Sequence, residues 1–277
     1  MKKTLFLSDL DGTLLQPDER LSDFTRETLI RLIGNGMLFS YATARSYSTA
    51  RHCTEGLTAE IPLIVHNGTF IIDNRTGKIL HKNTFQPEQA AKIFSLLSQN
   101  GVAPIVYSIL DEKERFSYNR LRIPDETWAF ILTRKGDGRE RMLLSDETIL
   151  DGEVYYFACI DREERLFPVW KELCAQYRSI LNCVYQKDIY SGHQWLEIMP
   201  ASASKAHAAR QLKTLTGAKR LVVFGDGKND LPLFEAGDEG YAVENADPAL
   251  KEKATAVIGS NTNNGVADWL LENSGYA

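Results

Sequence analysis

The sequence predicts an α/β protein in which a parallel-sheet core is interrupted by a separate α+β unit. Strand-like apolar runs alternate with helix-like runs near both ends of the chain, and this order is typical of parallel strands joined by crossover helices. The middle of the chain instead carries runs that suit an antiparallel sheet covered by two helices. The length of 277 residues exceeds what one compact core usually needs, which leaves one large domain or two smaller ones open.

The elements near the N-terminus follow from the hydrophobic pattern. Apolar runs predict strands at residues 4–7, 37–41 and 61–65. A helical pattern spans residues 21–33, and Gly34 and Gly36 mark its end. The first run is too short for the core of a signal peptide, because Asp9 interrupts it.

The elements near the C-terminus repeat this order. A helix that begins at Lys205 carries Leu212 and Leu215 on one face, and a β-branched run at residues 220–224 predicts a buried strand. Asp247, which precedes a proline, has the character of an N-cap. Both ends of the chain therefore carry the alternating strands and helices of a parallel sheet.

The middle of the chain predicts a unit of a different kind. Four runs suit antiparallel strands, at residues 101–108, 154–160, 179–186 and 194–198. Two apolar stripes at helical spacing, one around Ile93 and one around Leu166, predict helices that cover this sheet. Residues 111–141 are rich in charge and turn formers, and only a short helix at residues 127–132 is expected there.

The composition excludes several classes of protein. With 32 Lys and Arg against 37 Asp and Glu, the net charge of -5 gives no global field that attracts nucleic acid or an anionic membrane. No segment approaches the roughly 20 apolar residues of a membrane helix, so neither nucleic acid nor membrane is expected as a partner. The four cysteines are scattered without a CxxC pair, which favours reduced thiols in a cytoplasmic protein.

Two carboxylates follow directly on the first predicted strand. Asp9 and Asp11 belong to the run DLDGTL at residues 9–14, and open α/β sheets bind ligands at such strand ends. If the chain stays extended, alternation places both side chains on the same side, where a cation would relieve their repulsion. A polar strand end followed by an ordinary Asp-Gly turn explains this motif equally well when it is taken alone.

A second acidic motif follows the strand at residues 220–224. It is GDGKND, residues 225–230, and it contributes Asp226 and Asp230. If the two strands are neighbours, the carboxylates of both motifs converge, and such a group favours a hard divalent cation such as Mg²⁺ over the alternative, Ca²⁺. The spacing fits neither an EF-hand loop nor a Walker A motif.

Two further residues are candidates for binding an anion. Thr43 ends the second predicted strand, and Lys205 begins a helix whose free N–H groups also attract anions. Taken singly, an isolated threonine or lysine is more commonly a strand or surface residue.

In this order the motifs resemble those of the haloacid dehalogenase superfamily. The matching residues are the run at 9–14, Thr43, Lys205 and the run at 225–230. The resemblance extends to Asn67 and Gly68 after the third predicted strand and to residues 244–257 and 264–267, so it covers the whole core. It implies a Rossmann-like parallel-sheet core at residues 1–84 and 200–277. It also implies an inserted α+β cap of type IIB (C2B), as in Cof-like hydrolases, at residues 85–199.

The resemblance also implies a mechanism of phosphate-ester hydrolysis. Asp9 is the nucleophile that forms an aspartyl-phosphate, and Asp11 is the acid and then the base. The implied Mg²⁺ ligands are Asp9, Asp226 and the backbone carbonyl of Asp11, with Asp230 orienting Lys205 or a metal-bound water. The implied phosphate-binding residues are Thr43, Ala44, Lys205 and Asn229.

Some residues depart from the family pattern or leave alternatives open. Ala44 and Ala206 stand where many relatives have glycine, and Glu244 would disfavour a second anionic group on the substrate. Arg45 pairs either with substrate or with the cap, although an arginine at a helix start is more commonly a surface charge. The expected substrate is a small phosphomonoester, especially a sugar phosphate; a phosphomutase and a non-catalytic binding regulator remain alternatives, and the oligomeric state stays open.

Overall fold

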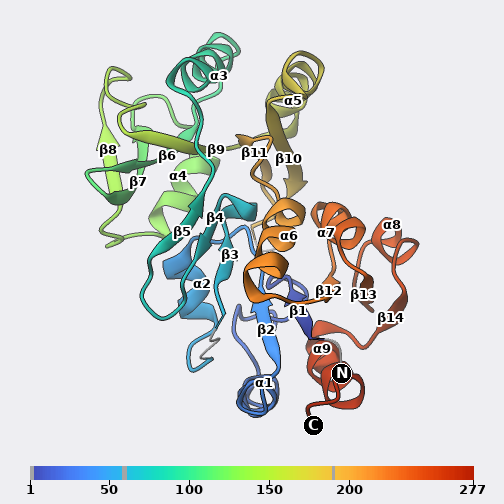
Figure 1. The fold of residues 1–277 in the computed structure, drawn as a ribbon. Helices are drawn as coiled ribbons and strands as arrows, with labels where there is room; N and C mark the ends of the chain where they lie inside the picture. Colours follow the sequence, from blue (N-terminus) through green and yellow to red (C-terminus); the bar gives the residue numbers. More distant parts are fainter. Residues whose placement is uncertain (1–2, 58–60, 189–190) are drawn as a thin grey trace. The chain divides into compact units, whose positions relative to one another are not determined.

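The computed structural model describes residues 3–57, 61–188 and 191–277 (Figure 1). The chain divides into two compact units. The core unit comprises Met1–Lys82 and Ala203–Ala277, and the inserted unit comprises Asn83–Ser202. The insertion expected at residues 85–199 falls within the second of these units.

A parallel sheet of five strands lies at the centre of the core unit, in the order β14-β13-β12-β1-β2. Its strands are β1 (Thr4–Ser8), β2 (Leu38–Tyr41), β12 (Arg220–Gly225), β13 (Glu239–Val243) and β14 (Ala256–Ile258). Every residue of β1 is buried, as the apolar run predicts for a central strand covered on both faces. The α/β class is confirmed, and the two ends of the chain meet where β1 pairs with β12.

The third predicted strand forms, but not as a full member of that sheet. It belongs to a small antiparallel sheet of β3 (Leu63–Val65), β4 (Phe70–Ile72) and β5 (Ile79–Lys82). A single parallel bridge between Ala42 and Ile64 joins β3 to the end of β2. The reason is local, because the chain reverses through a 3₁₀ turn at His66–Gly68 and β3 pairs with the strand that follows at once.

Helices surround the core sheet (Figure 1). They are α1 (Asp23–Gly34), α2 (Tyr47–Cys53), α6 (Lys205–Thr216), α7 (Leu231–Ala236), α8 (Pro248–Lys251) and α9 (Gly265–Asn273). Serine side chains cap the first turns of α1, α2 and α6. At α6, the Ser204 hydroxyl accepts a hydrogen bond from the N–H of His207 at 3.1 Å. Asp247 caps α8 in the same way, as its position before a proline predicts.

The inserted unit is built on a sheet of six strands in the order β10-β11-β9-β6-β7-β8. Its strands are β6 (Ile105–Leu110), β7 (Lys113–Asn119), β8 (Glu140–Leu143), β9 (Glu153–Asp161), β10 (Leu181–Lys187) and β11 (Gln194–Pro200). Its helices are α3 (Pro87–Gln99), α4 (Asp125–Leu132) and α5 (Glu163–Tyr177). Ile93 of α3 and Leu166 of α5 are buried in one apolar core with Phe157 of the sheet, which confirms both predicted helices.

One expectation for the inserted unit was wrong. The strand expected from residue 101 begins at Ile105, because Asn100 caps the end of α3 and Gly101 turns the chain with a left-handed φ of 70°. The four predicted strands pair antiparallel, as expected, and the short helix forms as α4. Residues 111–141, otherwise unassigned from the sequence, also contain β7 and the start of β8, which pair in parallel at one edge of the sheet. β8 is an edge strand whose residues are exposed or half-buried, and it therefore lacks an apolar run.

Other features of the described residues agree with the composition. All four cysteines are free thiols, and Cys53 and Cys159 are buried. Over residues 3–57, 61–188 and 191–277, no helix has the length and apolar character needed to cross a membrane.

Candidate active site

The pairing of β1 with β12 brings the two acidic motifs together. Ser8 pairs with Phe224, and the N–H of Asp9 donates to the Phe224 carbonyl at 2.9 Å. Asp9 therefore leaves the sheet beside the turn that carries Asp226 and Asp230. This arrangement at the carboxyl ends of adjacent parallel strands is the one that the sequence predicts.

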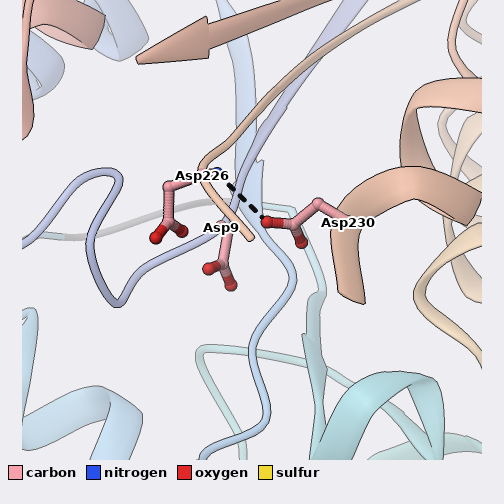
Figure 2. Close-up of side chains that lie close together, drawn as sticks. All are labelled: Asp9, Asp226 and Asp230. Carbon is pink, nitrogen blue, oxygen red and sulfur yellow. Dashed lines mark hydrogen bonds between the residues drawn. The ribbon is translucent and has the colours of Figure 1, made fainter. Parts of the chain in front are cut away.

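Asp9, Asp226 and Asp230 form a buried carboxylate cluster (Figure 2). One carboxylate oxygen from each residue lies within 4.8 Å of those of the other two. Asp9 is 5% exposed and Asp230 is fully buried, while Asp226 is partly exposed. The cluster thus concentrates negative charge in a poorly solvated place, where charges interact strongly.

Lys205 supplies a positive charge to the cluster. Its Nζ donates to Asp9 Oδ1 at 2.6 Å and to Asp230 Oδ1 at 2.8 Å, and the lysine is 4% exposed. Burial alone would lower the pKa of Lys205, but the carboxylates of Asp230 and Asp9 more than reverse this and raise it. The side chain is therefore a fixed ammonium at neutral pH.

One ammonium does not balance three carboxylates. Burial raises the pKa of Asp9 well above its usual value, and the neighbouring Asp230 and Asp226 add to this although Lys205 opposes it. Burial and the Asp230 charge raise the pKa of Asp226 to about 7. A further cation would stabilise the ionised forms of both groups.

The loop after β1 lies against Asp226. The Thr13 hydroxyl donates to Asp226 Oδ1 at 2.9 Å, a contact that no pattern in the sequence indicates. Gly12 has a φ of 74°, and a Cβ there would lie 2.3 Å from Asp226 Oδ2. Glycine is therefore required at this point of the loop, both for the turn and for the close approach to the carboxylate.

The chain does not stay extended between Asp9 and Asp11. The chain turns after Leu10, whose carbonyl accepts hydrogen bonds from the N–H groups of Thr13, Leu14 and Leu15. Asp11 instead accepts hydrogen bonds from Arg45, whose Nε lies 2.9 Å from Oδ2 and whose Nη2 lies 2.5 Å from Oδ1. The chain therefore does not stay extended through Asp11. The Asp11 charge nevertheless adds to the effect of burial in raising the pKa of Asp9 and of Asp226, so its carboxylate lies near theirs.

Arg45 is a residue whose contacts the sequence did not predict. Its side chain is 10% exposed and also binds the Glu19 carboxylate, with Nη2 and Oε2 2.7 Å apart. It is therefore not an ordinary surface charge. The available signal was its place two residues after Thr43, in the loop that follows β2.

Thr43, Ala44 and Asn229 lie in loops that surround these groups. The N–H of Ala42 donates to the Ser8 carbonyl at 2.9 Å, so Thr43 follows directly beside the end of β1. Thr43 is fully buried, and its hydroxyl oxygen accepts a hydrogen bond from the N–H of Arg45 at 3.1 Å. Ala44 and Asn229 are half-buried, after β2 and β12 respectively.

The donor set of the cluster fits a hard divalent cation. Its oxygens are carboxylate oxygens, which Mg²⁺ and Ca²⁺ prefer. The Asp230 oxygens already accept hydrogen bonds, Oδ1 from Lys205 and Oδ2 from the backbone of Asp226 and Gly227 at 3.2 Å each. Asp9 and Asp226 are therefore the better placed ligands, with Asp230 holding Lys205 and the loop in position.

Comparison with known proteins places this site in a family. A model of the haloacid dehalogenase-like hydrolases matches residues 6–270. The chain is 29% identical to 5-amino-6-(5-phospho-D-ribitylamino)uracil phosphatase YwtE of Bacillus subtilis (strain 168), over 94% of each protein. It is 25% identical to pyridoxal phosphate phosphatase YbhA of Escherichia coli (strain K12), over 95% of each.

A solved structure agrees in fold over nearly the whole chain. A haloacid dehalogenase-like hydrolase from Bacteroides thetaiotaomicron superposes with a TM-score of 0.79 at 22% identity, covering 98% of this chain and 99% of that one. The fold, the family model and the order of the motifs agree. The chain therefore belongs to the haloacid dehalogenase-like hydrolase family, and it is a phosphatase-type enzyme of that family.

Proposed function

We propose that the protein is a Mg²⁺-dependent phosphomonoester hydrolase that acts on a small phosphorylated metabolite such as a sugar phosphate. The observation that carries this proposal is the cluster of Asp9, Asp226 and Asp230 with Lys205 at the ends of β1 and β12. Two relatives are named for phosphatase activity on small phosphorylated compounds, which supports the substrate class. We place the enzyme in the cytoplasm, with neither nucleic acid nor membrane as a partner.

In this proposal Asp9 is the nucleophile. Its carboxylate attacks phosphorus, forms an aspartyl-phosphate and releases the alcohol, and water then hydrolyses the acyl phosphate and regenerates Asp9. Lys205 holds the Asp9 carboxylate at 2.6 Å and is placed to bind a phosphoryl oxygen. The Thr43 hydroxyl, with Ala44 and Asn229 from the neighbouring loops, binds the remaining phosphoryl oxygens.

Asp11 is the proposed acid and base. It would give a proton to the leaving oxygen in the first step and take one from water in the second. Its ion pair with Arg45 fixes the direction of the carboxylate in the structure. Glu19 binds the same guanidinium and limits the positions that Arg45 can take.

The cation site is proposed from the donor set alone. Asp9, Asp226 and the backbone carbonyl of Asp11 would hold Mg²⁺, which when bound neutralises charge on the transferring phosphoryl group. Thr13 fixes Asp226 through its hydroxyl, and Asp230 supports Lys205. Both contacts are hydrogen bonds between side chains of the protein, so they do not depend on the cation.

The two units have different proposed tasks. The core unit, expected at residues 1–84 and 200–277, carries the phosphate chemistry, since all the residues named above belong to it. The inserted unit, expected at residues 85–199, is proposed as a type IIB cap that selects the leaving group. A site that recognises only phosphate cannot distinguish one ester from another.

The proposal is tested with a panel of phosphomonoesters that includes sugar phosphates, pyridoxal phosphate and an aryl phosphate. Phosphate release is measured with Mg²⁺, with Ca²⁺ and with EDTA, for the wild type and for Asp9→Asn. Asp268→Asn, at an exposed aspartate of α9, is the matched control and should retain full activity. The expected result is Mg²⁺-dependent turnover that only Asp9→Asn abolishes.

Three other results would change the assignment. Full activity of Asp9→Asn would remove Asp9 as the nucleophile. Transfer of the phosphoryl group to a second sugar hydroxyl faster than release of inorganic phosphate would indicate a phosphomutase. Absence of turnover on every ester, combined with ligand binding, would indicate a regulator.

A further inference from the structure

The turn at His66–Gly68 has an unusual backbone for a buried segment. All three residues have positive φ, at 48° for His66, 53° for Asn67 and 95° for Gly68. His66 and Asn67 are each 3% exposed. L-residues rarely adopt this conformation, and runs of it persist only where the surroundings hold them in place.

One side of this turn holds the loop that contains Thr43. The N–H of His66 donates to the Arg45 carbonyl at 3.0 Å, and the N–H of Asn67 donates to the Thr43 carbonyl at 2.9 Å. The N–H of Thr43 in turn donates to the Ile64 carbonyl at 3.0 Å. The backbone of the loop is therefore fixed from the side of β3 and its turn.

The other side of the turn lies against the start of α6. A Cβ at Gly68 would lie 2.2 Å from the carbonyl oxygen of Ser204 and 2.9 Å from the backbone nitrogen of Lys205. Both are backbone atoms, which cannot rotate away as the end of a side chain can. The absence of a side chain at Gly68 thus sets how closely α6 approaches the turn.

We propose that the His66–Gly68 turn is a positioning element that sets the separation between Thr43 and Lys205, and with it the affinity for phosphate. The inference rests on the proposed function, in which these two residues bind phosphoryl oxygens. The turn touches the backbone of both phosphate-binding segments. Its left-handed conformation allows consecutive N–H groups to bind one segment while Gly68 admits the other.

The test compares two glycines with nearly the same φ. Gly36 has a φ of 94°, and a Cβ added there would meet nothing within 4 Å, whereas Gly68 has a φ of 95° and its Cβ would meet Ser204. Gly36→Ala therefore reports the cost of the left-handed conformation alone. The readout is the inhibition constant of inorganic phosphate with Mg²⁺ present, and thermal unfolding is followed in parallel.

Gly68→Ala is expected to raise this inhibition constant at least tenfold, and Gly36→Ala to leave it within twofold. The effect should act through Lys205. In a Lys205→Gln background, Gly68→Ala should therefore raise the inhibition constant much less than it does in the wild type. An unchanged constant in Gly68→Ala, or full additivity with Lys205→Gln, would overturn the proposal.

A second variant keeps the test decisive if Gly68→Ala does not fold. Ser204→Ala removes the cap hydrogen bond to His207 but leaves the contact with the turn. If the turn positions Lys205, the inhibition constant stays within threefold although the protein loses stability; a tenfold rise would assign the positioning to the helix cap instead. Failure of the wild type to bind phosphate would count against the proposed function, whereas binding that is insensitive to the turn counts against this inference alone.

Discussion

Asp9 and Asp11 are two residues apart, yet their carboxylates have different partners and different exposure. Asp9 is 5% exposed, contacts Lys205 and shares the buried cluster with Asp226 and Asp230. The side chain of Asp11 is 25% exposed and forms an ion pair with Arg45. Between the two residues the chain begins to turn, since the Leu10 carbonyl accepts hydrogen bonds from three N–H groups that follow it.

The difference shows how one loop can serve two chemical tasks. In the cluster the negative charge is only partly compensated, so it attracts a cation, and Lys205 together with that cation would offset the charge of a phosphoryl group. At Asp11 the guanidinium of Arg45 already compensates the carboxylate. Environment, rather than residue type, separates the proposed nucleophile from the proposed acid and base.

The largest expected effect distinguishes these two carboxylates. Asp9→Asn should reduce kcat by about 10⁴-fold or more, since it removes the nucleophile. Asp11→Asn should reduce kcat by about 10²- to 10³-fold for alkyl phosphates and by less for an aryl phosphate, whose leaving group needs little protonation. Steady-state kinetics on both esters measures this; equal losses on the two esters would contradict the acid role of Asp11.

The next effect concerns the cation. Asp226→Asn should raise the Mg²⁺ concentration for half-maximal activity by at least about tenfold, because one of two proposed carboxylate ligands is lost. Asp238→Asn, at a carboxylate paired with Lys213 on the surface of the same unit, is the control and should leave the Mg²⁺ requirement unchanged. Mg²⁺ titration of activity checks both variants, and an unchanged requirement in Asp226→Asn would remove it as a ligand.

A smaller effect is expected at the ion pair of Asp11. Arg45→Lys should reduce kcat by about tenfold, because an ammonium cannot bind the carboxylate through two nitrogens as the guanidinium does. Glu19→Gln should change kcat by less than about twofold, since the Glu19 side chain is 44% exposed and solvent screens the pair. If both variants lose activity equally, the pair of Arg45 with Glu19 would matter as much as its pair with Asp11, and the specific role of the Asp11 pair would be contradicted.

The smallest effect is a pH dependence of stability. In the cation-free protein the pKa of Asp226 is about 7, against an ordinary value of 3.8, so between these pH values the folded state keeps a proton that the unfolded chain has lost. This contribution to stability is present below pH 3.8 and is lost as the pH rises through about 7.

Thermal unfolding checks this sign. With EDTA, the Tm of the wild type relative to that of Asp226→Asn should fall by a few degrees as the pH rises from about 5 to about 7.5. Mg²⁺ binds the ionised carboxylate, so the stabilisation that it provides should grow over the same range. A Tm difference between the two proteins that does not vary with pH would contradict the raised pKa.

Much of the core unit could be predicted because its signals are local. The run before Asp9 and the run before Asp226 are apolar, as buried parallel strands require, and an acidic turn follows each. The N-cap at Asp247 is likewise encoded by adjacent residues.

The features that could not be predicted depend on contacts between distant residues. Arg45 reaches Asp11 only because the chain turns after Leu10, and Thr13 reaches Asp226 across the pairing of β1 with β12. β8 lies at a sheet edge, where partial exposure removes the apolar alternation that identifies a strand. In each case the information lies in the partner segment rather than in the residue itself.

The pairing of β1 with β12 also bears on how the protein folds. It joins residues 4–8 to residues 220–224, so the cluster can form only after the two ends of the chain have met. The inserted unit, by contrast, is continuous in sequence and has its own apolar core. Since closing a long loop costs entropy before its contacts form, we expect the insertion to fold first and to shorten the effective loop that β1 and β12 must close. The insertion would then help to assemble an active site to which it contributes none of the residues that carry the phosphate chemistry.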